Sequence, residues 1–427
     1  QITNGVATAA QGALADTAVQ PEDLGDGFGT KTAISVDPTS VTETARLTSG
    51  NLTDYLHTAT DGTYVISWNN NGTGGGGPSG AGIQIHLASD NSYVSDIQTD
   101  LNYLHSLHAS DGILVVAQAN YNNWQGKVVA YDIVTGNMLW TKLGAASNHY
   151  YGRMVRVGST AVAIHSMPDG YSNAAGRLEI FDLSGNLLHT IDGTEYYEKL
   201  GLGLAINSTY FAYNRGVAEH YQNTQQVVIR EISSGNVVAT IDNPNGGSNG
   251  FWAAMNNDDN QMDMSETNLV IGSSGKQTYV DGVLYKGAAF VYDFTGTLLN
   301  TFADVVSSVD NGTFFGTGVA TEGDLVYVGA HSERHQYTGL NADRIEIFSI
   351  SENAHKNTIN FVNGDTEGTE FGREFFVSGS VLAAGATNKS NNSENGSLFT
   401  VFNFASSTQT SFVVDDSLFA TKDYVDS

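Results

Sequence analysis

Short apolar runs separated by clusters of Asn, Asp, Gly and Ser recur along the whole chain. Apolar and polar residues alternate within many of these runs, and Val, Ile, Thr, Tyr and Phe are frequent in them. Both features are typical of half-buried β-strands joined by tight turns. The pattern therefore predicts an all-β protein.

One unit repeats along the chain: an alternating strand that ends near Asp, a tight turn with Gly or Asn, and a second short strand. Its clearest copy is GKVVAYDIVTGNMLWT, Gly126–Thr141. The turn residues tolerate positive φ, as a tight hairpin requires. Further copies begin at Gly176, Gln225 and Gly287, and weaker copies begin at Gly82, Asp343 and Gly396.

A third apolar run precedes each copy, such as Ile113–Gln118 or Ala161–Ser166, and several copies have a fourth run upstream, such as Tyr151–Val157. Four strands per unit, with units starting roughly 44 to 62 residues apart, is the period of β-propeller blades. We therefore predict a seven-bladed β-propeller of four-stranded antiparallel blades. A β-sandwich array or a β-helix is the alternative, and the variable spacing and the scarcity of proline argue against both.

The predicted propeller spans residues 29–414. Residues 1–28 form an Ala-rich segment in which Ile2, Val6 and Ala9 have helical spacing, and residues 415–427 again contain a short helix-like pattern. We expect short α-helical connectors at both ends. Because the chain does not begin with Met, we expect it to be processed or to be part of something longer.

The charge of the chain narrows the range of partners. Lys+Arg number 18 against 45 Asp+Glu, which gives a formal net charge of −27. Such a surface repels phosphate backbones and anionic lipids, and no apolar run approaches the ~20 residues of a bilayer-spanning helix. We expect no nucleic acid partner and no membrane insertion. The absence of cysteine excludes disulfides, thiolate metal sites and a cysteine nucleophile.

Two Phe-Gly pairs open predicted blades: Phe315-Gly316, followed by GDLVYVGAHSE, and Phe371-Gly372, followed by GSVLAAGATNKS. These segments resemble the FG-GAP type of propeller repeat, found in integrin α-chains and many secreted microbial proteins. The resemblance implies a propeller and, in that family, calcium loops of the form D-x-D-x-D-G. This sequence lacks such a loop. Its nearest approach consists of Asp258, Asn260 and Asp263, which we interpret as a solvated acidic loop.

The two ends of the chain carry a second resemblance. The strings AAQGALADTAVQPEDL (Ala9–Leu24) and FATKDYVDS (Phe419–Ser427) look like connector sequences of bacteriophage tail-fibre and related virion appendage proteins. The resemblance implies a virion or extracellular location. It also implies self-association, or binding to other virion structural proteins, through the terminal connectors.

Motifs for catalysis are missing. The sequence has no G-x-S-x-G elbow, no H-E-x-x-H pair and no Walker-type loop. Gly126–Thr141 resembles a blade of pyrroloquinoline-quinone dehydrogenases, which the general strand, Asp-containing turn and strand of a propeller blade explains. Ala59–Trp68 faintly resembles a sialidase box, and the sequence has no other such box. The close histidine pairs His105/His108 and His331/His335 are interpreted as hydrogen-bonded strand-end histidines or surface histidines rather than metal ligands. We expect no enzyme activity and no cofactor.

A binding function suits the predicted loops better. The connections between second and third strands emerge on one face, are rich in Asn and Gly, and include Ser273–Gly287 and Thr387–Gly396. Aromatic rings with amides nearby suit sugars, because the C–H groups of a sugar stack on the ring while its hydroxyls bind polar groups. The alternative is that these residues cap loops and pack between blades. The candidate glycan-binding residues are Trp68, Tyr121, Trp124, His165, Tyr171, Tyr221, Tyr279, Tyr285, His331 and Tyr337.

These observations predict a non-enzymatic structural module of a phage tail fibre or similar appendage, acting as a spacer, binding a host-surface polysaccharide, or both. The alternative is a secreted microbial FG-GAP-like adhesion or filament protein. A quinoprotein-like or glycan-active propeller enzyme is the third possibility.

Overall fold

The structure is a computed structural model of the 427-residue chain. The residues that it describes are 29–48, 57–69, 82–101, 104–145, 149–167, 175–194, 200–216, 226–243, 261–280, 283–304, 313–332, 343–360, 371–390 and 393–413. The chain divides into two compact units, one of residues 1–35 with 406–427 and a larger one, Val36–Ala405, to which most of the strands belong. Within the described residues, no helix is both long and apolar enough to cross a membrane.

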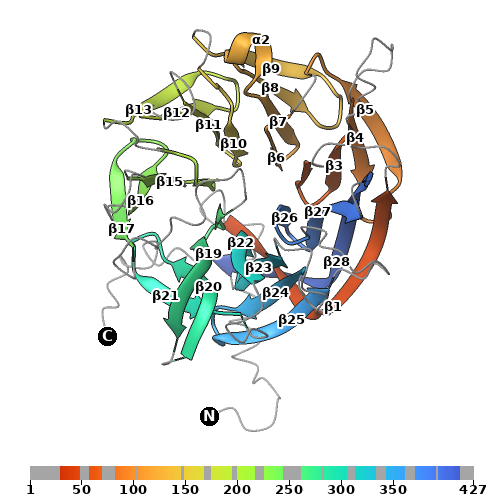
Figure 1. Ribbon diagram of the computed structural model, residues 1–427, viewed down its shortest axis with the longest axis vertical. Helices are drawn as coiled ribbons and strands as arrows, with labels where there is room; N and C mark the ends of the chain where they lie inside the picture. Colours follow the sequence, from red (N-terminus) through yellow and green to blue (C-terminus); the bar gives the residue numbers. More distant parts are fainter. Residues whose placement is uncertain are drawn as a thin grey trace, which may run out of the picture. The chain divides into compact units, whose positions relative to one another are not determined.

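In the first four sheets the strands are antiparallel and follow chain order (Figure 1). The first sheet contains β2 (Thr58–Thr60), β3 (Tyr64–Asn69), β4 (Gly82–Leu87) and β5 (Tyr93–Gln98). The second contains β6 (Ser106–Ser110), β7 (Ile113–Gln118), β8 (Lys127–Asp132) and β9 (Met138–Leu143). The third contains β10 (Met154–Val157), β11 (Ala161–Ser166), β12 (Arg177–Asp182) and β13 (Leu187–Asp192). The fourth contains β14 (Leu204–Ile206), β15 (Tyr210–Arg215), β16 (Gln226–Glu231) and β17 (Val237–Asp242).

The remaining strands form two further sheets. An eight-stranded sheet contains β18 (Met262–Met264), β19 (Leu269–Val280), β20 (Val283–Tyr292), β21 (Leu298–Phe302), β22 (Thr313–Glu322), β23 (Leu325–Ser332), β24 (Arg344–Ser349) and β25 (Ala354–Asn360). The last sheet has the order β1-β28-β27-β26, with β1 (Gly29–Thr48), β26 (Phe375–Ser378), β27 (Val381–Ser390) and β28 (Ser393–Val413).

The predicted all-β fold of four-stranded antiparallel sheets is confirmed, but the count of seven separate blades is not. Five four-stranded sheets stand separately, and the eight strands β18–β25 are joined in one sheet. The joint is a single parallel bridge, between Gly287 of β20 and Phe315 of β22. Sequence periodicity reveals the strands but not this backbone contact.

Two further predictions need comment. The expected helical connectors, residues 1–28 and 415–427, lie outside the described residues, and the one helix that the described part of the chain contains is the short α2 (Tyr121–Trp124). The expected loops Ser273–Gly287 and Thr387–Gly396 were wrong in part. Strands β19 and β20 pair again from Gln277 to Lys286 after an irregularity, which carries their hairpin on into the predicted loop. Strands β27 and β28 likewise extend their hairpin to Ser390 and Ser393.

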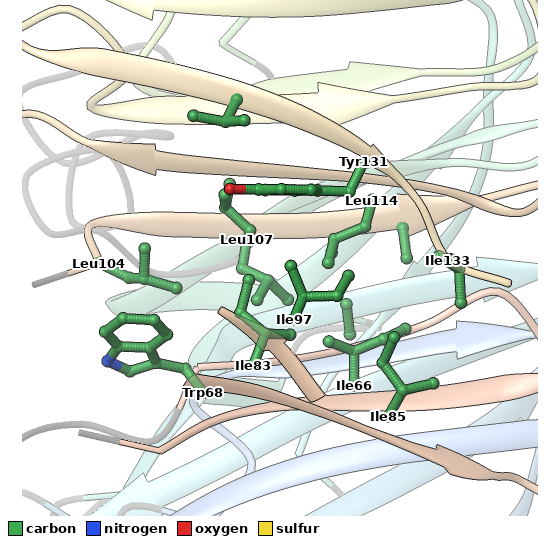
Figure 2. Close-up of a cluster of buried hydrophobic side chains, with 14 of the residues drawn as sticks. Ile66, Trp68, Ile83, Ile85, Ile97, Leu104, Leu107, Leu114, Tyr131 and Ile133 are labelled. Carbon is green, nitrogen blue, oxygen red and sulfur yellow. The ribbon is translucent and has the colours of Figure 1, made fainter. Parts of the chain in front are cut away.

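The strand that opens each four-strand repeat contacts the strand that opens the next repeat; we call these the first strands. These contacts run in a cycle, from β2 to β6, β10, β14, β18, β22, β26 and back to β2. Hydrophobic clusters fill the spaces between consecutive sheets, because the strands carry apolar residues on both faces. In Figure 2, Trp68 and Ile66 of the first sheet share such a cluster with Leu114 and Tyr131 of the second. The first strands therefore surround a common axis, which is the arrangement of a β-propeller.

The last hairpin of most sheets has the same β-bulge. In β8–β9 the register shifts between Ala130 and Tyr131, so that β9 bulges there. The hairpins β4–β5, β12–β13, β16–β17, β20–β21 and β24–β25 have the same irregularity. At five of these bulges the outer strand exposes an apolar pair, as Met138 and Leu139 do in β9. The other pairs are Tyr93 with Val94, Leu187 with Leu188, Val237 with Val238, and Leu298 with Leu299.

Candidate functional site

Among the described residues, part of the aromatic surface predicted from the loops is exposed at the connection between β7 and β8. Trp124 is 39% exposed, and its ring stacks on Tyr150 with 4.8 Å between the ring centroids and 30° between the planes. The N–H of Tyr150 donates to the carbonyl of Trp124 at 2.8 Å. We call this pair of rings the Trp124 platform.

The backbone that carries the platform is unusual. Asn122, Asn123 and Trp124 have φ values of 45°, 58° and 61° in succession, and Tyr150 has 45°. Left-handed backbone is costly for a bulky aromatic residue, by ~1–3 kcal/mol at each such site, and persists where surrounding contacts enforce it. Here the side chain of Gln125 donates to the carbonyl of Gly144 at 2.6 Å and anchors the loop. These contacts therefore hold the backbone in the conformation that leaves the indole of Trp124 exposed.

The next residues of this loop dock on the following sheet. Gly126 has φ of 83°, and a Cβ atom on it would lie 2.1 Å from the carbonyl oxygen of Tyr151. Only glycine allows that approach. Tyr151 itself is buried. The loop before β8 and the segment Tyr150–Arg153 before β10 therefore lie side by side, at the same end of the molecule.

Other predicted glycan residues lie elsewhere. Trp68 is 2% exposed and packs in the cluster between the first two sheets, so its indole serves the core. His165 is 0% exposed within β11. Tyr121 is half-buried, and the ammonium of Lys127 lies 5.1 Å from the centroid of its ring. Among the candidates whose side chains the structure describes, Trp124 lies at the surface, with the half-buried Tyr121 in the same loop.

The remaining candidates yield less. Tyr171, Tyr221 and Tyr337 lie outside the described residues. Tyr279 and Tyr285 pair through their backbones with Leu284 and Thr278 in the β19–β20 hairpin, and His331 of β23 pairs with Phe314. These three are therefore strand residues rather than residues of open loops.

Of the weak metal candidates, Asp258 and Asn260 fall outside the described residues, and Asp263 lies in β18. Asp263 accepts a hydrogen bond from the N–H of Thr321 at 2.8 Å. Among the residues that the structure describes, no group of three His, Asp or Glu side chains could hold a metal ion.

A second candidate site, made of polar residues, lies around the common axis of the first strands. In several sheets the residue before the first strand meets the second strand at an equivalent position, as the N–H of His105 does with the carbonyl of Ala117. We call the polar members of this set the axial collar: His57, His105, Arg153, Gln261 and Glu374. They come from five different sheets, so the fold gathers residues that are far apart in sequence.

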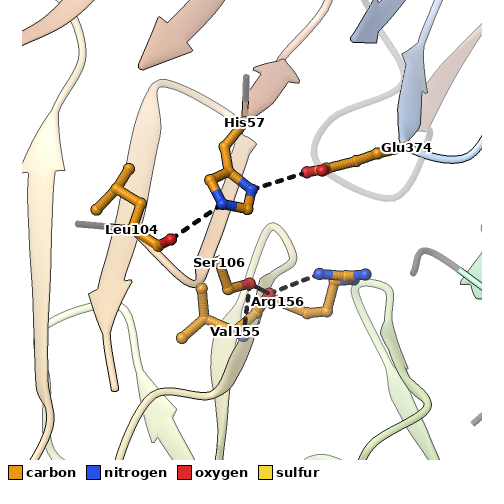
Figure 3. A network of polar contacts seen from close by, with 6 residues as sticks. All are labelled: His57, Leu104, Ser106, Val155, Arg156 and Glu374. Carbon is orange, nitrogen blue, oxygen red and sulfur yellow. Dashed lines mark hydrogen bonds and ion pairs between the residues drawn. The ribbon is translucent and has the colours of Figure 1, made fainter. Parts of the chain in front are cut away.

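His57 binds two other sheets at once. Its Nδ1 lies 3.3 Å from Oε1 of Glu374 in the last sheet, and its Nε2 lies 3.0 Å from the carbonyl oxygen of Leu104 before β6 (Figure 3). Nε2 faces a carbonyl oxygen and therefore carries a proton, and a second proton lies between Nδ1 and the carboxyl group of Glu374. His57 thus links the first sheet to the second and to the last.

His105 and Arg153 continue the collar. The Nδ1 of His105 accepts the N–H of Ala119 at 3.2 Å, so a neutral His105 carries its proton on Nε2 and presents a donor there. Burial, with the charges of Arg153 and His57, lowers the pKa of His105 to about 3. Arg153 is 5% exposed.

A second layer of residues lies two or three positions further along the same first strands. Arg156 donates from Nη1 to the carbonyl of Val155 at 2.9 Å and lies 5.5 Å from the centroid of the Phe376 ring. Burial lowers the pKa of Arg156 to about 10, and Asp263 and Glu374 oppose that change. The N–H of Val157 donates to Nδ1 of His108 at 3.3 Å, and the His108 ring meets Phe376 edge-on.

Sequence reasoning found part of this site. His105 and His108 were interpreted as hydrogen-bonded strand-end residues, and both accept backbone N–H groups. Arg153, Arg156 and Glu374 were missed. The available signal was position: one polar residue directly before the innermost strand of several repeats. It becomes visible only when the repeats are aligned on their first strands rather than on their last hairpins.

The comparisons with known proteins concern the fold. No family model matches the chain, and no curated protein matches it. Among solved structures, U3-55K has a TM-score of 0.51 at 10% identity, over 86% of this chain and 99% of that one. The propeller domain of the Trilobed protease from Pyrococcus furiosus has 0.50 at 11%, over 87% and 100%. The RRP9 WD40 repeats have 0.50 at 10%, over 87% and 100%. At these identities the likeness shows the fold, and that fold is the β-propeller.

Proposed function

We propose that this protein is a non-enzymatic propeller scaffold that binds a glycan through the Trp124 platform. The observation that carries the proposal is the exposed indole of Trp124, stacked on Tyr150 and held by three successive left-handed residues. Strained, exposed aromatic residues on a rigid scaffold are typical of binding sites.

The chemistry of the platform suits a sugar ring. The C–H face of a pyranose packs against an aromatic face, and the polar groups of the loop are available for hydroxyls. The side-chain amide of Asn122 donates to the side chain of Gln125 at 3.1 Å. This bond orders two polar side chains next to Trp124 in the sequence.

We propose a phage virion appendage as the setting, with the module acting as a spacer or in attachment to a host surface. Support comes from the terminal sequences Ala9–Leu24 and Phe419–Ser427, which resemble tail-fibre connectors. Self-association, or binding to other virion proteins, would then run through these ends. A secreted FG-GAP-like adhesion or filament protein is the alternative, and the Phe-Gly openings favour it.

We also infer that the eight-stranded sheet acts as two blades, β18–β21 and β22–β25, which gives the propeller seven. A hydrophobic cluster joins Val270 and Val291 of the first half to Val319 and Val326 of the second, in the way that clusters join separate sheets. The bridge to β22 at Gly287 repeats the close glycine approach that Gly126 makes between two separate sheets.

The glycan proposal is tested with full-length protein on an array of microbial surface polysaccharides, followed by calorimetry on any hit. Trp124→Ala and Tyr150→Ala should each weaken binding at least tenfold, since stacking is lost. Tyr93→Ala is the matched control, because Tyr93 is an exposed aromatic residue on the outer strand β5. Equal losses in all three variants, or no polysaccharide bound by the parent protein, would refute the proposal.

A further inference from the structure

The outer strands form a surface separate from the Trp124 platform. In five hairpins the β-bulge holds two exposed apolar residues in succession, and in β9 these are Met138 (59% exposed) and Leu139 (47%). The first residue of each pair lies next to the register shift, and the second is the extra residue of the bulge. Single exposed apolar residues are ordinary, whereas an apolar surface repeated in five hairpins marks contact with a partner. We call the five pairs the apolar rim.

Each pair lies beside the hairpin turn of the following sheet. In β9 the residue after the pair is Trp140, whose indole N–H donates to the carbonyl of Leu183 in the next turn at 2.9 Å. In β13 the residue after the pair is His189, whose Nε2 lies 2.6 Å from the carbonyl oxygen of Ile232 in the turn after that. The turns before β9 and β21 likewise pack against the preceding outer strand. Apolar pairs and turns therefore alternate from one sheet to the next.

These turns add negative charge to the rim. Asp182 directly precedes Leu183, and Glu231 directly precedes Ile232. Hydrogen bonds from the side chain and the N–H of Asn186 lower the pKa of Asp182, so that its carboxylate is ionised at neutral pH. A carboxylate stands in each of the five hairpins: Asp90, Asp132, Asp182, Glu231 and Asp293. Along the rim, exposed apolar side chains and ionised carboxylates therefore lie next to one another.

The hairpin β24–β25 shows the contrast. At the position of the apolar pair it has His355 and Lys356, and the ammonium of Lys356 pairs with Glu352 of its own turn at 2.5 Å. Within the described part of the chain, no Lys or Arg forms an ion pair with the carboxylates of the other five hairpins. Those hairpins therefore offer both an apolar surface and a negative charge to a partner.

A second copy of this chain fits the rim poorly, because its carboxylates would meet carboxylates in a protein of net charge −27. We propose that the apolar rim docks a basic, amphipathic segment of another protein. The apolar side chains of that segment cover the exposed pairs, and its Lys or Arg side chains pair with the carboxylates of the turns. This docking does not depend on glycan binding, since the loop of Trp124 precedes β8 whereas the turn at the rim follows it.

Calorimetry of the full chain with three synthetic peptides of equal length tests the proposal. One peptide alternates Leu and Lys, the second has Ser in place of Leu, and the third has Glu in place of Lys. We expect the Leu–Lys peptide to bind at least tenfold more tightly than either of the others. Equal binding of the Leu–Lys and Ser–Lys peptides would show that the carboxylates act without the apolar pairs, and it would overturn the proposal.

Variants of β9 locate the binding. Met138→Thr combined with Leu139→Thr should weaken binding of the Leu–Lys peptide at least threefold, and Thr at all five pairs should remove its advantage over the Ser–Lys peptide. Threonine retains the β propensity of the outer strands. Leu143→Thr is the matched control, because Leu143 is 52% exposed at the other end of the same strand. Equal losses in the β9 pair variant and in Leu143→Thr would overturn the proposal.

Two further measurements separate the charge from self-association. Asp182→Asn should weaken binding of the Leu–Lys peptide, whereas Asp192→Asn should not, because Asp192 pairs with Arg177 at the other end of its outer strand. Sedimentation velocity of the parent protein alone should show no dimer at neutral pH. A dimer that Thr at all five pairs dissociates would assign the rim to a second copy and overturn the proposal, whatever polysaccharide the Trp124 platform binds.

Discussion

At the scale of single residues, glycine sets how closely consecutive sheets approach. Gly126 has positive φ, and an added Cβ would meet the carbonyl oxygen of Tyr151 at 2.1 Å. Gly287 repeats the arrangement, with Phe315 at 2.0 Å. Tyr151-Gly152 and Phe315-Gly316 are the other half of this contact, which explains why an aromatic residue followed by glycine opens these two repeats.

This contact predicts a large cost for Gly126→Ala. Backbone strain accounts for about 1 kcal/mol, and displacement of the neighbouring backbone adds to it. Gly112→Ala is the matched control, since Gly112 also has positive φ (77°) but has open space around its Cβ position. Urea unfolding should show Gly126→Ala less stable than Gly112→Ala by more than about 1 kcal/mol. Equal losses would mean that the close approach does not matter.

A second residue makes stability depend on pH. Burial raises the pKa of Glu322 to about 7, the neighbouring Asp263 and Glu266 raise it further, and the hydrogen bond from the N–H of Gly379 opposes them. The folded state then binds more protons at Glu322 than the unfolded state does between about pH 4.5 and pH 7. Over that range the contribution of Glu322 to stability falls as pH rises.

Glu322→Gln should therefore gain stability relative to the parent between pH 5 and pH 8, by about 3 kcal/mol at most. Urea unfolding at several pH values measures the difference. Glu352→Gln is the control, because Glu352 lies at the surface in an ion pair with Lys356. A parent–variant difference that stays constant with pH would show that Glu322 titrates normally.

At the scale of elements, the periodic pattern predicted the strands well. The runs Ile113–Gln118 and Ala161–Ser166 are β7 and β11 to the residue. The hairpin turns also follow from sequence, because Asp132 accepts bonds from the N–H and hydroxyl of Thr135 at 2.7 and 2.8 Å. The length of the β19–β20 hairpin was not predictable, since Ser273–Gly287 alternates too weakly to distinguish strand from loop.

The candidate site was less predictable than the strands. Trp124 was found because an aromatic residue in an Asn-rich loop is conspicuous. Its exposure, however, depends on Asn122 and Asn123 adopting positive φ, which no residue pattern specifies. Trp68 and His165 looked as good as Trp124 in the sequence. Both are buried, because each lies near the end of a strand whose two faces pack against neighbouring sheets.

At the scale of the whole larger unit, the first and last sheets close the ring, and the chain itself joins them, because β1 lies in the last sheet and precedes β2. Strands β2 and β26 are in contact, and Val65 packs with Val381 and Val401 in a small hydrophobic cluster. The His57–Glu374 pair adds a polar link at the collar. Among the described side chains, the apolar cluster and the polar pair therefore both hold this closure together.

We therefore expect His57→Ala to loosen this closure. The variant should lose about 1–3 kcal/mol, since a hydrogen bond to a charged partner and one to a carbonyl are both removed. Hydrogen exchange should accelerate at the amides of β2 and β26. His189→Ala is the control, because His189 also bridges two sheets, through the carbonyl of Ile232 at 2.6 Å, but away from the closure. Unchanged exchange at β2 and β26 in His57→Ala would contradict this expectation.

The apolar pairs at the outer bulges affect how molecules of this protein attract one another in solution. Five outer strands carry exposed side chains such as Met138 and Leu299, so two molecules that meet attract each other at short range. The net charge of −27 keeps them apart at neutral pH. Since the isoelectric point is about 4.5, mild acid removes that repulsion while the attraction remains. The dispersed state of this propeller is therefore maintained by its carboxylates.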